Sequence, residues 1–328
     1  MNSTMKAIVF TRYGSPDVLE FKDVATPAAA ENEVFIEICA ASVNPLDWHI
    51  MRGEPVFIRL MTGLFKPKRT ILGCDIAGRV EAVGANVKQF HPGDEVFGGS
   101  ETGGFAEYVC VPENKLALKP ANSTFEAAAA LPVAAITALQ GLRDQGQIKP
   151  GQKVLIDGAS GGVGTFAIQI ARSFGAEVTA VCSTRNVDTS RTLGADHVID
   201  YTKQDFTRNG QHYDLIFAPN AYHSIFDYRR ALSQDGICVK AGGKASFAGM
   251  LVDMLLGPLL SMMGRKKARL MLAKINNRDL VTLKDLVESG KIAPVIDRSY
   301  PLRNAAEAVR YLEEGHAQGK VVLAVSRH

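Results

Sequence analysis

A glycine-rich turn between a short apolar run and an amphipathic stretch places the strongest constraint on how this chain folds. The apolar run covers residues 154–156, the turn GASGGVG covers residues 158–164, and apolar residues then recur at helical spacing over 166–171. A strand, a glycine turn and a helix in this order open a βαβ unit. Glycines in such a turn let the backbone approach a pyrophosphate, which the N–H groups of the helix N-terminus stabilise. The segment therefore predicts a dinucleotide-binding site.

The turn departs slightly from the strict GxGxxG pattern. Ala159 stands at the first glycine position, while Gly161 and Gly164 occupy the other two. Alanine is small enough for a tight turn, so we retain the prediction. The alternative is a glycine-rich connection that binds no ligand. The residues expected to face the cofactor here are Ser160, Gly161, Gly162, Val163 and Gly164.

Strand-like and helix-like runs alternate from about residue 153 onward. Strands are expected at VLIDGA, EVTAVCS, HVIDY, YDLIFA and GICVKAGG, and 269–274 is expected to add a last strand at the sheet edge. Alternation of this kind predicts a parallel, doubly wound sheet. A helix-like run over 126–142, broken at Pro132, precedes it.

The flanking parts of the chain have a different pattern. Residues 1–125 contain short strand-like runs and many glycines, which is typical of a β-rich domain with tight turns. After residue 276, a helix, a strand, a helix and a terminal strand are expected to complete that first domain. We therefore predict two domains, one from residues 1–125 and 276–328 and one from residues 126–275.

Charge and cysteine content exclude several classes of protein. The net charge of +3 is too small to indicate a nucleic-acid partner. The five cysteines lie far apart, without a CxxC pair or a Cys/His cluster, which argues against a disulfide scaffold or a zinc knuckle. Reduced thiols and an N-terminus without a signal-peptide core lead us to expect a cytoplasmic protein.

One segment, Phe247 to Met263, is apolar enough to raise the question of a membrane. Asp253 and the Gly257-Pro258 pair interrupt it, and it is shorter than the ~20 residues that a span requires. We favour a buried or pocket-lining helix, and weak membrane association through an interfacial helix remains the alternative.

The end of the second strand of a dinucleotide fold selects between NAD and NADP. A carboxylate there would bind the ribose hydroxyls and repel a 2′-phosphate. This strand ends instead in Cys182, followed by Ser183, Thr184 and Arg185. Two hydroxyls and a guanidinium suit a phosphate, so we predict NADPH. The alternative is that Arg185 is a solvated loop residue.

Four motifs in the expected order resemble the medium-chain dehydrogenase/reductase superfamily, and within it the zinc-independent, quinone oxidoreductase-like (zeta-crystallin-type) branch. They are the glycine segment 151–172, the segment GCDIAGRVEAVGANVKQFHPGDEVFG with Asp75 in place of the usual Glu, the loop ASVNPLD at 41–47, and the ending GKVVLAV. Together they cover nearly the whole chain. The resemblance implies an α/β protein with a GroES-like β-rich catalytic domain and a Rossmann domain.

The departures from the family's zinc-dependent members concern the metal ligands. Asn44, Cys74 and about Val133 stand where those members supply catalytic zinc ligands, and the four-cysteine lobe is missing after Val96. Zinc requires three or four protein ligands, so we expect no metal. Hydride from NADPH then requires an acceptor activated by conjugation, a quinone or an α,β-unsaturated ketone or aldehyde.

The resemblance also implies individual site residues. Asn44 is expected to hydrogen-bond the substrate carbonyl or the nicotinamide ribose, or alternatively to cap the turn before Pro45. His49 is expected to relay a proton near neutral pH, or alternatively to contact the cofactor without an acid–base role. Asp47 is expected to brace this loop. The full set of expected cofactor contacts outside the glycine turn is Asn44, Thr137, Ser183, Thr184, Arg185, Tyr201, Gly242, Gly243, Val321 and Val322.

Several alternatives remain at this point. The apolar segments 56–68 and 247–263 are expected to flank a hydrophobic substrate cleft, or alternatively to lie in the core or a dimer contact. The edge strand near 269–274 leads us to expect a homodimer. The competing functions are a non-catalytic NADPH-binding structural or membrane-associated protein and, third, a zinc alcohol dehydrogenase.

Overall fold

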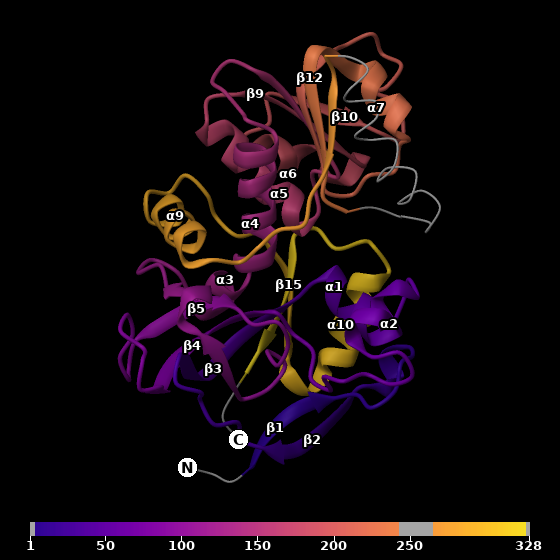
Figure 1. Ribbon diagram of the computed structural model, residues 1–328. Helices are drawn as coiled ribbons and strands as arrows, with labels where there is room; N and C mark the ends of the chain where they lie inside the picture. Colours follow the sequence, from indigo (N-terminus) through magenta and orange to yellow (C-terminus); the bar gives the residue numbers. More distant parts are fainter. Residues whose placement is uncertain (1–3, 243–264, 326–328) are drawn as a thin grey trace. The chain divides into compact units, whose positions relative to one another are not determined.

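The computed structural model describes residues 4–242 and 265–325, which belong to two compact units (Figure 1). Unit 1 comprises residues 1–133, 275–289 and 294–328, and unit 2 comprises residues 134–274 and 290–293. The expected combination of a β-rich unit and a parallel-sheet unit is confirmed.

Unit 1 is built around a seven-stranded sheet with the order β14-β15-β3-β4-β5-β7, and β6 pairs with β3. Alternating side chains of β3 and β4, such as Ile36, Ile38 and Val80, fill the core beneath it. The described elements of unit 1 are β1 (Thr4–Val9), β2 (Glu20–Ala25), β3 (Glu33–Val43), α1 (Pro45–Arg52), α2 (Phe57–Thr62), β4 (Asp75–Val83), β5 (Glu95–Gly99), β6 (Tyr108–Pro112), β7 (Leu116–Leu118), α3 (Phe125–Ala129), α9 (Asn277–Glu288), β14 (Ile296–Pro301), α10 (Ala305–Glu313) and β15 (Lys320–Ala324).

Unit 2 contains a six-stranded, wholly parallel sheet with the order β10-β9-β8-β11-β12-β13. From β8 the chain first adds β9 and β10 on one side of the sheet and then β11, β12 and β13 on the other. Ligands of doubly wound sheets bind at the carboxyl ends of the strands at such a switch point. The elements are α4 (Pro132–Gln140), which begins in unit 1, β8 (Lys153–Asp157), α5 (Gly162–Ser173), β9 (Glu177–Cys182), α6 (Val187–Thr192), β10 (His197–Asp200), β11 (Tyr213–Ala218), α7 (Ile225–Ala231), β12 (Leu232–Lys240) and β13 (Lys267–Leu270).

The unit boundaries differ from the expected ones at two places. The first lies after Val133, because α3 packs on β3 and β4 of unit 1 and the Val133 N–H donates to Asp75 at 2.9 Å. The second concerns residues 290–293, which we expected in the first domain. Gln169 of α5 holds them in unit 2, because its side-chain amide both donates to and accepts from the backbone of Ala293 at 3.0 and 2.8 Å.

The structure also describes the edge strand and one of the two apolar segments. The last strand of the parallel sheet covers 267–270 rather than 269–274. Within the described ranges, no helix is long and apolar enough to cross a membrane. The segment Phe247 to Met263 lies outside the described residues. Segment 56–68 is not part of the core, since most of its large apolar side chains are exposed.

Candidate functional site

The glycine turn of unit 2 has a shape that only glycine allows at two positions. Gly158 follows β8 with φ of +88°, in the left-handed region, and a Cβ there would lie 2.9 Å from the Cβ of Asn220. A Cβ on Gly164 would lie 2.1 Å from the carbonyl oxygen of Gly158, which is impossible without movement of the turn. The close approach of helix α5 to the end of β8 therefore depends on these glycines.

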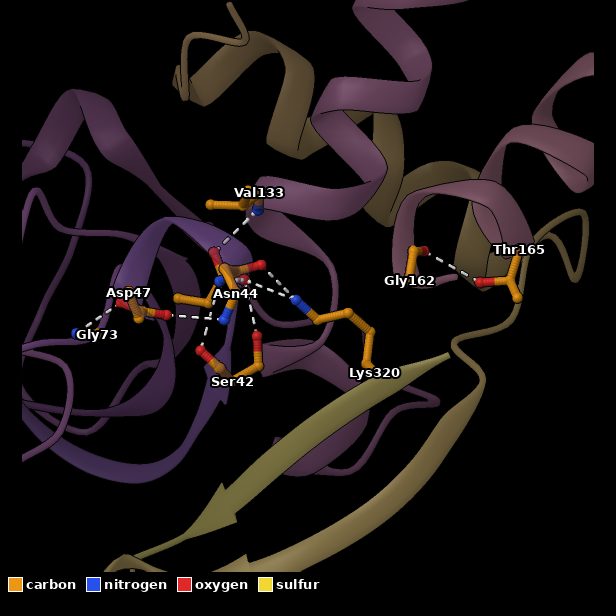
Figure 2. Close-up of polar contacts among 9 residues, drawn as sticks. Ser42, Asn44, Asp47, Gly73, Val133, Gly162, Thr165 and Lys320 are labelled. Carbon is orange, nitrogen blue, oxygen red and sulfur yellow. Dashed lines mark hydrogen bonds and ion pairs between the residues drawn. The ribbon is translucent and has the colours of Figure 1, made fainter. Parts of the chain in front are cut away.

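The N-terminus of α5 is suited to a phosphate group. Gly161 is the N-cap residue of this twelve-residue helix, and no side chain caps it. The Thr165 hydroxyl instead donates to the Gly162 carbonyl at 3.1 Å (Figure 2). A Cβ on Gly161 would meet no atom closer than 3.7 Å, so the space in front of the turn is open. Uncapped N–H groups at a helix N-terminus stabilise an anion, and the residues present therefore fit a dinucleotide pyrophosphate.

A carboxylate that sequence reasoning missed lies beside the end of β9, on the neighbouring strand. Asp200, the last residue of β10, is registered opposite Cys182, the last residue of β9. The Thr184 hydroxyl donates to its carboxylate at 2.6 Å and the Thr202 hydroxyl donates at 2.7 Å. These hydrogen bonds, that from Thr184 first, lower the pKa of Asp200. The sequence signal for this carboxylate is the strand run HVID, which ends in Asp200. Parallel neighbouring strands end at the same edge of a sheet, so Asp200 lies beside the end of β9.

Asp200 changes the role expected of Thr184. The hydroxyl that we assigned to a cofactor phosphate is already committed to this carboxylate. Lys203 lies 3.3 Å from the same carboxylate and offsets part of its charge. Ser183 and Arg185 are thus the remaining predicted groups for a 2′-phosphate at this edge.

The other expected cofactor contacts differ in their surroundings. The Tyr201 side chain follows β10 and is 61% exposed, as a ligand contact requires. Gly242 follows β12 and accepts from the Ala221 N–H at 3.2 Å, while Gly243 lies outside the described residues. Thr137 is buried in α4. Val321 and Val322 are fully buried in β15, so the structure leaves no accessible surface for the cofactor contacts expected at these two valines.

Unit 1 contains a buried polar cluster formed by Ser42, Asn44, Asp75 and Lys320 (Figure 2). The Asp75 carboxylate, 0% exposed, accepts from the Ser42 hydroxyl at 2.7 Å and from the Asn44 amide at 2.9 Å. The Lys320 ammonium, 3% exposed, lies 3.3 Å from the same carboxylate. With the Val133 N–H on its other oxygen, this buried charge is fully hydrogen-bonded.

The Asn44 side chain is committed within this cluster at both ends. Its amide nitrogen donates to Asp75, and its Oδ1 accepts from Lys320 at 2.7 Å. Asn44 is also the N-cap residue of α1, the alternative that we considered. Contact with a substrate carbonyl or a ribose remains a prediction, and it requires this side chain, which is 2% exposed, to become accessible.

Asp47 braces the loop, as expected. Its carboxylate accepts from the Asn44 N–H at 2.7 Å and from the Gly73 N–H at 3.0 Å, which joins the start of α1 to the turn before β4. Burial, assisted by repulsion from Asp75, raises the pKa of Asp47 to about 7 against the effect of these two donors.

His49 is positioned by the backbone that follows α1. Its Nδ1 lies 2.7 Å from the carbonyl oxygen of Glu54. A carbonyl can only accept, so Nδ1 carries the proton and Nε2 of the neutral ring has a free lone pair. Burial lowers the pKa of His49 below its usual 6.5. The ring is therefore mainly neutral at pH 7 and can accept a proton at Nε2.

Lys320 and Ser42 were missed as site residues. Lys320 entered the sequence reasoning only as part of the ending GKVVLAV, although a lysine at the start of an apolar strand run is itself a signal. A lysine is almost never fully buried unless it is paired, so its position predicted a buried partner. The partner is Asp75, the residue that departs from the family's usual Glu.

The positions of the family's zinc ligands hold groups that are poorly suited to zinc. The Cys74 thiol donates to the Glu101 carbonyl at 3.5 Å, and burial raises its pKa well above the usual value, which disfavours the thiolate that binds metal. Asn44 is engaged as described, and Val133 offers only its backbone. Across the part of the chain that the structure describes, no three His, Cys, Asp or Glu side chains gather in a metal-binding group.

Comparison with known proteins agrees with this geometry. Residues 30–121 match the alcohol dehydrogenase GroES-like domain, and residues 193–323 match the family model described as zinc-binding dehydrogenase. The chain is 37% identical to 2-methylene-furan-3-one reductase of Solanum lycopersicum over 98% of its length and 79% of that protein. It is 35% identical to the chloroplastic NADPH-dependent alkenal/one oxidoreductase of Arabidopsis thaliana, over 97% of this chain and 79% of that protein.

A solved structure shows the same fold at full length. The quinone oxidoreductase from Coxiella burnetii is 32% identical, covers 98% of this chain and 100% of its own, and superposes with a TM-score of 0.85. With relatives this similar over almost the whole chain, this protein belongs to the medium-chain dehydrogenase/reductase superfamily, in the branch of the quinone and alkenal/one oxidoreductases.

Proposed function

We propose that this protein transfers hydride from NADPH to a quinone or an α,β-unsaturated ketone or aldehyde, without a metal. The observation that carries the proposal is the uncapped glycine turn at the switch point of a parallel sheet, with Ser183 and Arg185 at the end of the neighbouring strand. The printed names of the tomato and Arabidopsis relatives, a furanone reductase and an NADPH-dependent alkenal/one oxidoreductase, support the same acceptor chemistry.

The chemistry of the donor set favours a conjugated acceptor. Bound NADPH supplies the hydride, which adds to the electron-poor carbon of a conjugated system. A simple ketone needs its oxygen polarised by a metal or a strong proton donor, and the ligand positions Asn44, Cys74 and Val133 are unsuited to zinc. Quinones and enones are activated by their own conjugation, so this chain has to position them and manage one proton.

His49 is our candidate for that proton. Its Nδ1 is held by the Glu54 carbonyl, so Nε2 is the atom that exchanges the proton with the reduced acceptor or with water. Because the pKa of His49 is lowered, the imidazolium form is scarce at pH 7 and becomes abundant only in acid. Proton delivery by His49 therefore predicts faster turnover as the pH falls through that pKa.

A homodimer joined through β13 is our proposal for the assembly. On this edge of the parallel sheet β13 pairs only with β12, among the residues that the structure describes. Leu270, 49% exposed, and Leu272, 89% exposed, add apolar surface on and just after this edge strand. Leu272→Lys is expected to reduce the mass measured by light scattering to that of one chain of 35.3 kDa. A wild-type protein that has the mass of one chain by light scattering would contradict the proposal.

A cytoplasmic location also remains our proposal. It rests on the five cysteines, none of which takes part in a disulfide. Fractionation of the source cells tests it, and recovery of the protein with an exported fraction would contradict it.

One experiment tests the function. Purified protein is mixed with NADPH or NADH and a panel of 1,4-benzoquinone, 9,10-phenanthrenequinone, 2-alkenals and enones, and oxidation is followed at 340 nm. NADPH-dependent reduction of at least one conjugated acceptor, unchanged after chelation, is expected. Tight NADPH binding by fluorescence with no turnover would favour the non-catalytic alternative. Stoichiometric zinc with alcohol oxidation would favour the third.

A further inference from the structure

The segment from Val56 to Phe65 exposes an unusual amount of apolar surface. Five of its large side chains point to solvent in unit 1, and they have exposed fractions of 68% for Val56, 74% for Leu60, 81% for Met61, 52% for Leu64 and 90% for Phe65. Single exposed apolar residues are ordinary on protein surfaces. Five within ten residues concentrate apolar surface on one segment, called the patch below, and large exposed apolar patches mark binding surfaces.

The patch is held in place by specific contacts. The Tyr13 hydroxyl lies 2.9 Å from the Thr62 hydroxyl and donates to the Gly63 carbonyl at 2.5 Å. The Arg59 guanidinium stacks on the Tyr13 ring at 4.8 Å and donates to the Gly53 carbonyl at 3.1 Å. The polar side chains of the segment thus anchor it to unit 1 and leave the apolar ones to face outward.

The patch adjoins the candidate site through α1. Asn44 is the N-cap residue of helix α1, which carries His49 and packs against α2, the helix of Leu60 and Met61 (Figure 1). The hydrogen bond between His49 Nδ1 and the Glu54 carbonyl fixes the chain where it leaves α1 toward the patch. The candidate proton-transfer residue and the apolar surface are therefore parts of one local structure.

We propose that Val56, Leu60, Met61, Leu64 and Phe65 bind the hydrocarbon tail of the acceptor, and that the preferred substrates are conjugated carbonyls with long apolar chains. This inference rests on the proposed function and specifies its substrate class. A conjugated head engaged near Asn44 and His49 leaves the tail to lie along α2. Each methylene fully removed from water improves binding roughly fourfold, and each half-buried methylene about twofold.

A homologous series of acceptors tests the proposal. The ratio of kcat/KM for 2-nonenal to that for 2-pentenal, which differ by four methylenes, is measured with NADPH. Half-burial predicts a ratio of roughly 16 for the wild type. The variant Leu60→Ser/Met61→Ser/Phe65→Ser is expected to reduce this ratio to below about 3.

Matched controls use exposed apolar residues elsewhere on the molecule. Phe226 in α7 is 54% exposed and Leu118 in β7 is 47% exposed. Phe226→Ser and Leu118→Ser change hydrophobicity in the same way as the test variant and are expected to leave the chain-length ratio at its wild-type value. A fall in these controls as large as that in the test variant would overturn the proposal.

Further outcomes are decisive on their own. A wild-type ratio near 1 overturns the tail proposal and leaves the proposed function intact. If no acceptor is reduced, displacement of 1-anilinonaphthalene-8-sulfonate by nonanal compared with pentanal still tests the patch, and equal displacement overturns it. Lys66 and Lys68 follow the patch and no acidic residue lies between 55 and 69. Sedimentation with phosphatidylglycerol vesicles, lost in the triple variant, together with a flat chain-length ratio, would assign the patch to a lipid surface instead.

Discussion

Replacing Lys320 by methionine tests whether the buried polar cluster is held together by a real ion pair. Methionine preserves most of the length and volume of the lysine stem and removes its charge. Asp75 keeps three donors, from Ser42, Asn44 and Val133, but it loses the only cation beside it in the cluster, and Asn44 Oδ1 loses its donor.

The burial of both partners sets the magnitude. Removing one partner from a buried pair costs about 3–5 kcal/mol, because the remaining charge is left uncompensated. The three remaining donors place Lys320→Met at the lower end, at about 3 kcal/mol. For cooperative unfolding of 328 residues, this corresponds to a fall in Tm of about 4 °C. Asp75→Asn leaves the buried Lys320 ammonium without its carboxylate partner and is expected to cost a similar amount of stability.

Urea unfolding of both single variants and of the double variant measures the coupling. Removing both charges leaves no uncompensated ion, so the double variant should lose less than either single variant, and far less than the roughly 6 kcal/mol of an additive pair. Lys6→Met is the control. Lys6 lies 2.7 Å from Asp23, closer than Lys320 lies to Asp75, but the Lys6 side chain is 37% exposed. Lys6→Met should therefore cost less than about 1 kcal/mol of stability. A loss below 1 kcal/mol for Lys320→Met, or an additive double variant, would refute the reasoning.

Four further variants address the glycine turn, the cofactor and the proton. Gly164→Ala places a Cβ 2.1 Å from the Gly158 carbonyl oxygen and should lower the free energy of unfolding in urea by about 1–3 kcal/mol. Gly161→Ala, whose Cβ lies 3.7 Å from the same oxygen, should change it little. Equal losses would contradict the steric argument. Arg185→Ala should reduce the preference for NADPH over NADH in kcat/KM roughly tenfold or more, and an unchanged preference would show that Arg185 does not contact the phosphate. His49→Ala should abolish the rise in kcat on going from pH 7 to pH 5, since only the imidazolium donates; the same profile for both proteins from pH 5 to 9 would exclude the relay.

The elements and the glycine turn could be predicted because they depend on local pattern. The spacing of apolar residues determines α5 and its flanking strands, and the positive φ of Gly158 requires glycine whatever the distant contacts. The partners of charged residues could not be predicted in this way. Asp200 meets Thr184 through strand register, and Lys320 meets Asp75 although 245 residues separate them. Such pairings are properties of the assembled sheets.

The small stretch 290–293 has a consequence for dissecting the protein. The chain passes from one unit to the other after residues 133, 274, 289 and 293. A recombinant fragment of residues 134–274 would therefore lack the backbone of Ala293, and the buried Gln169 amide in α5 would lose its long-range partner. Neither unit is a single stretch of sequence, so neither can be produced alone as one continuous fragment. A circular permutant with new ends between 289 and 294 would break the chain in the stretch that Gln169 holds.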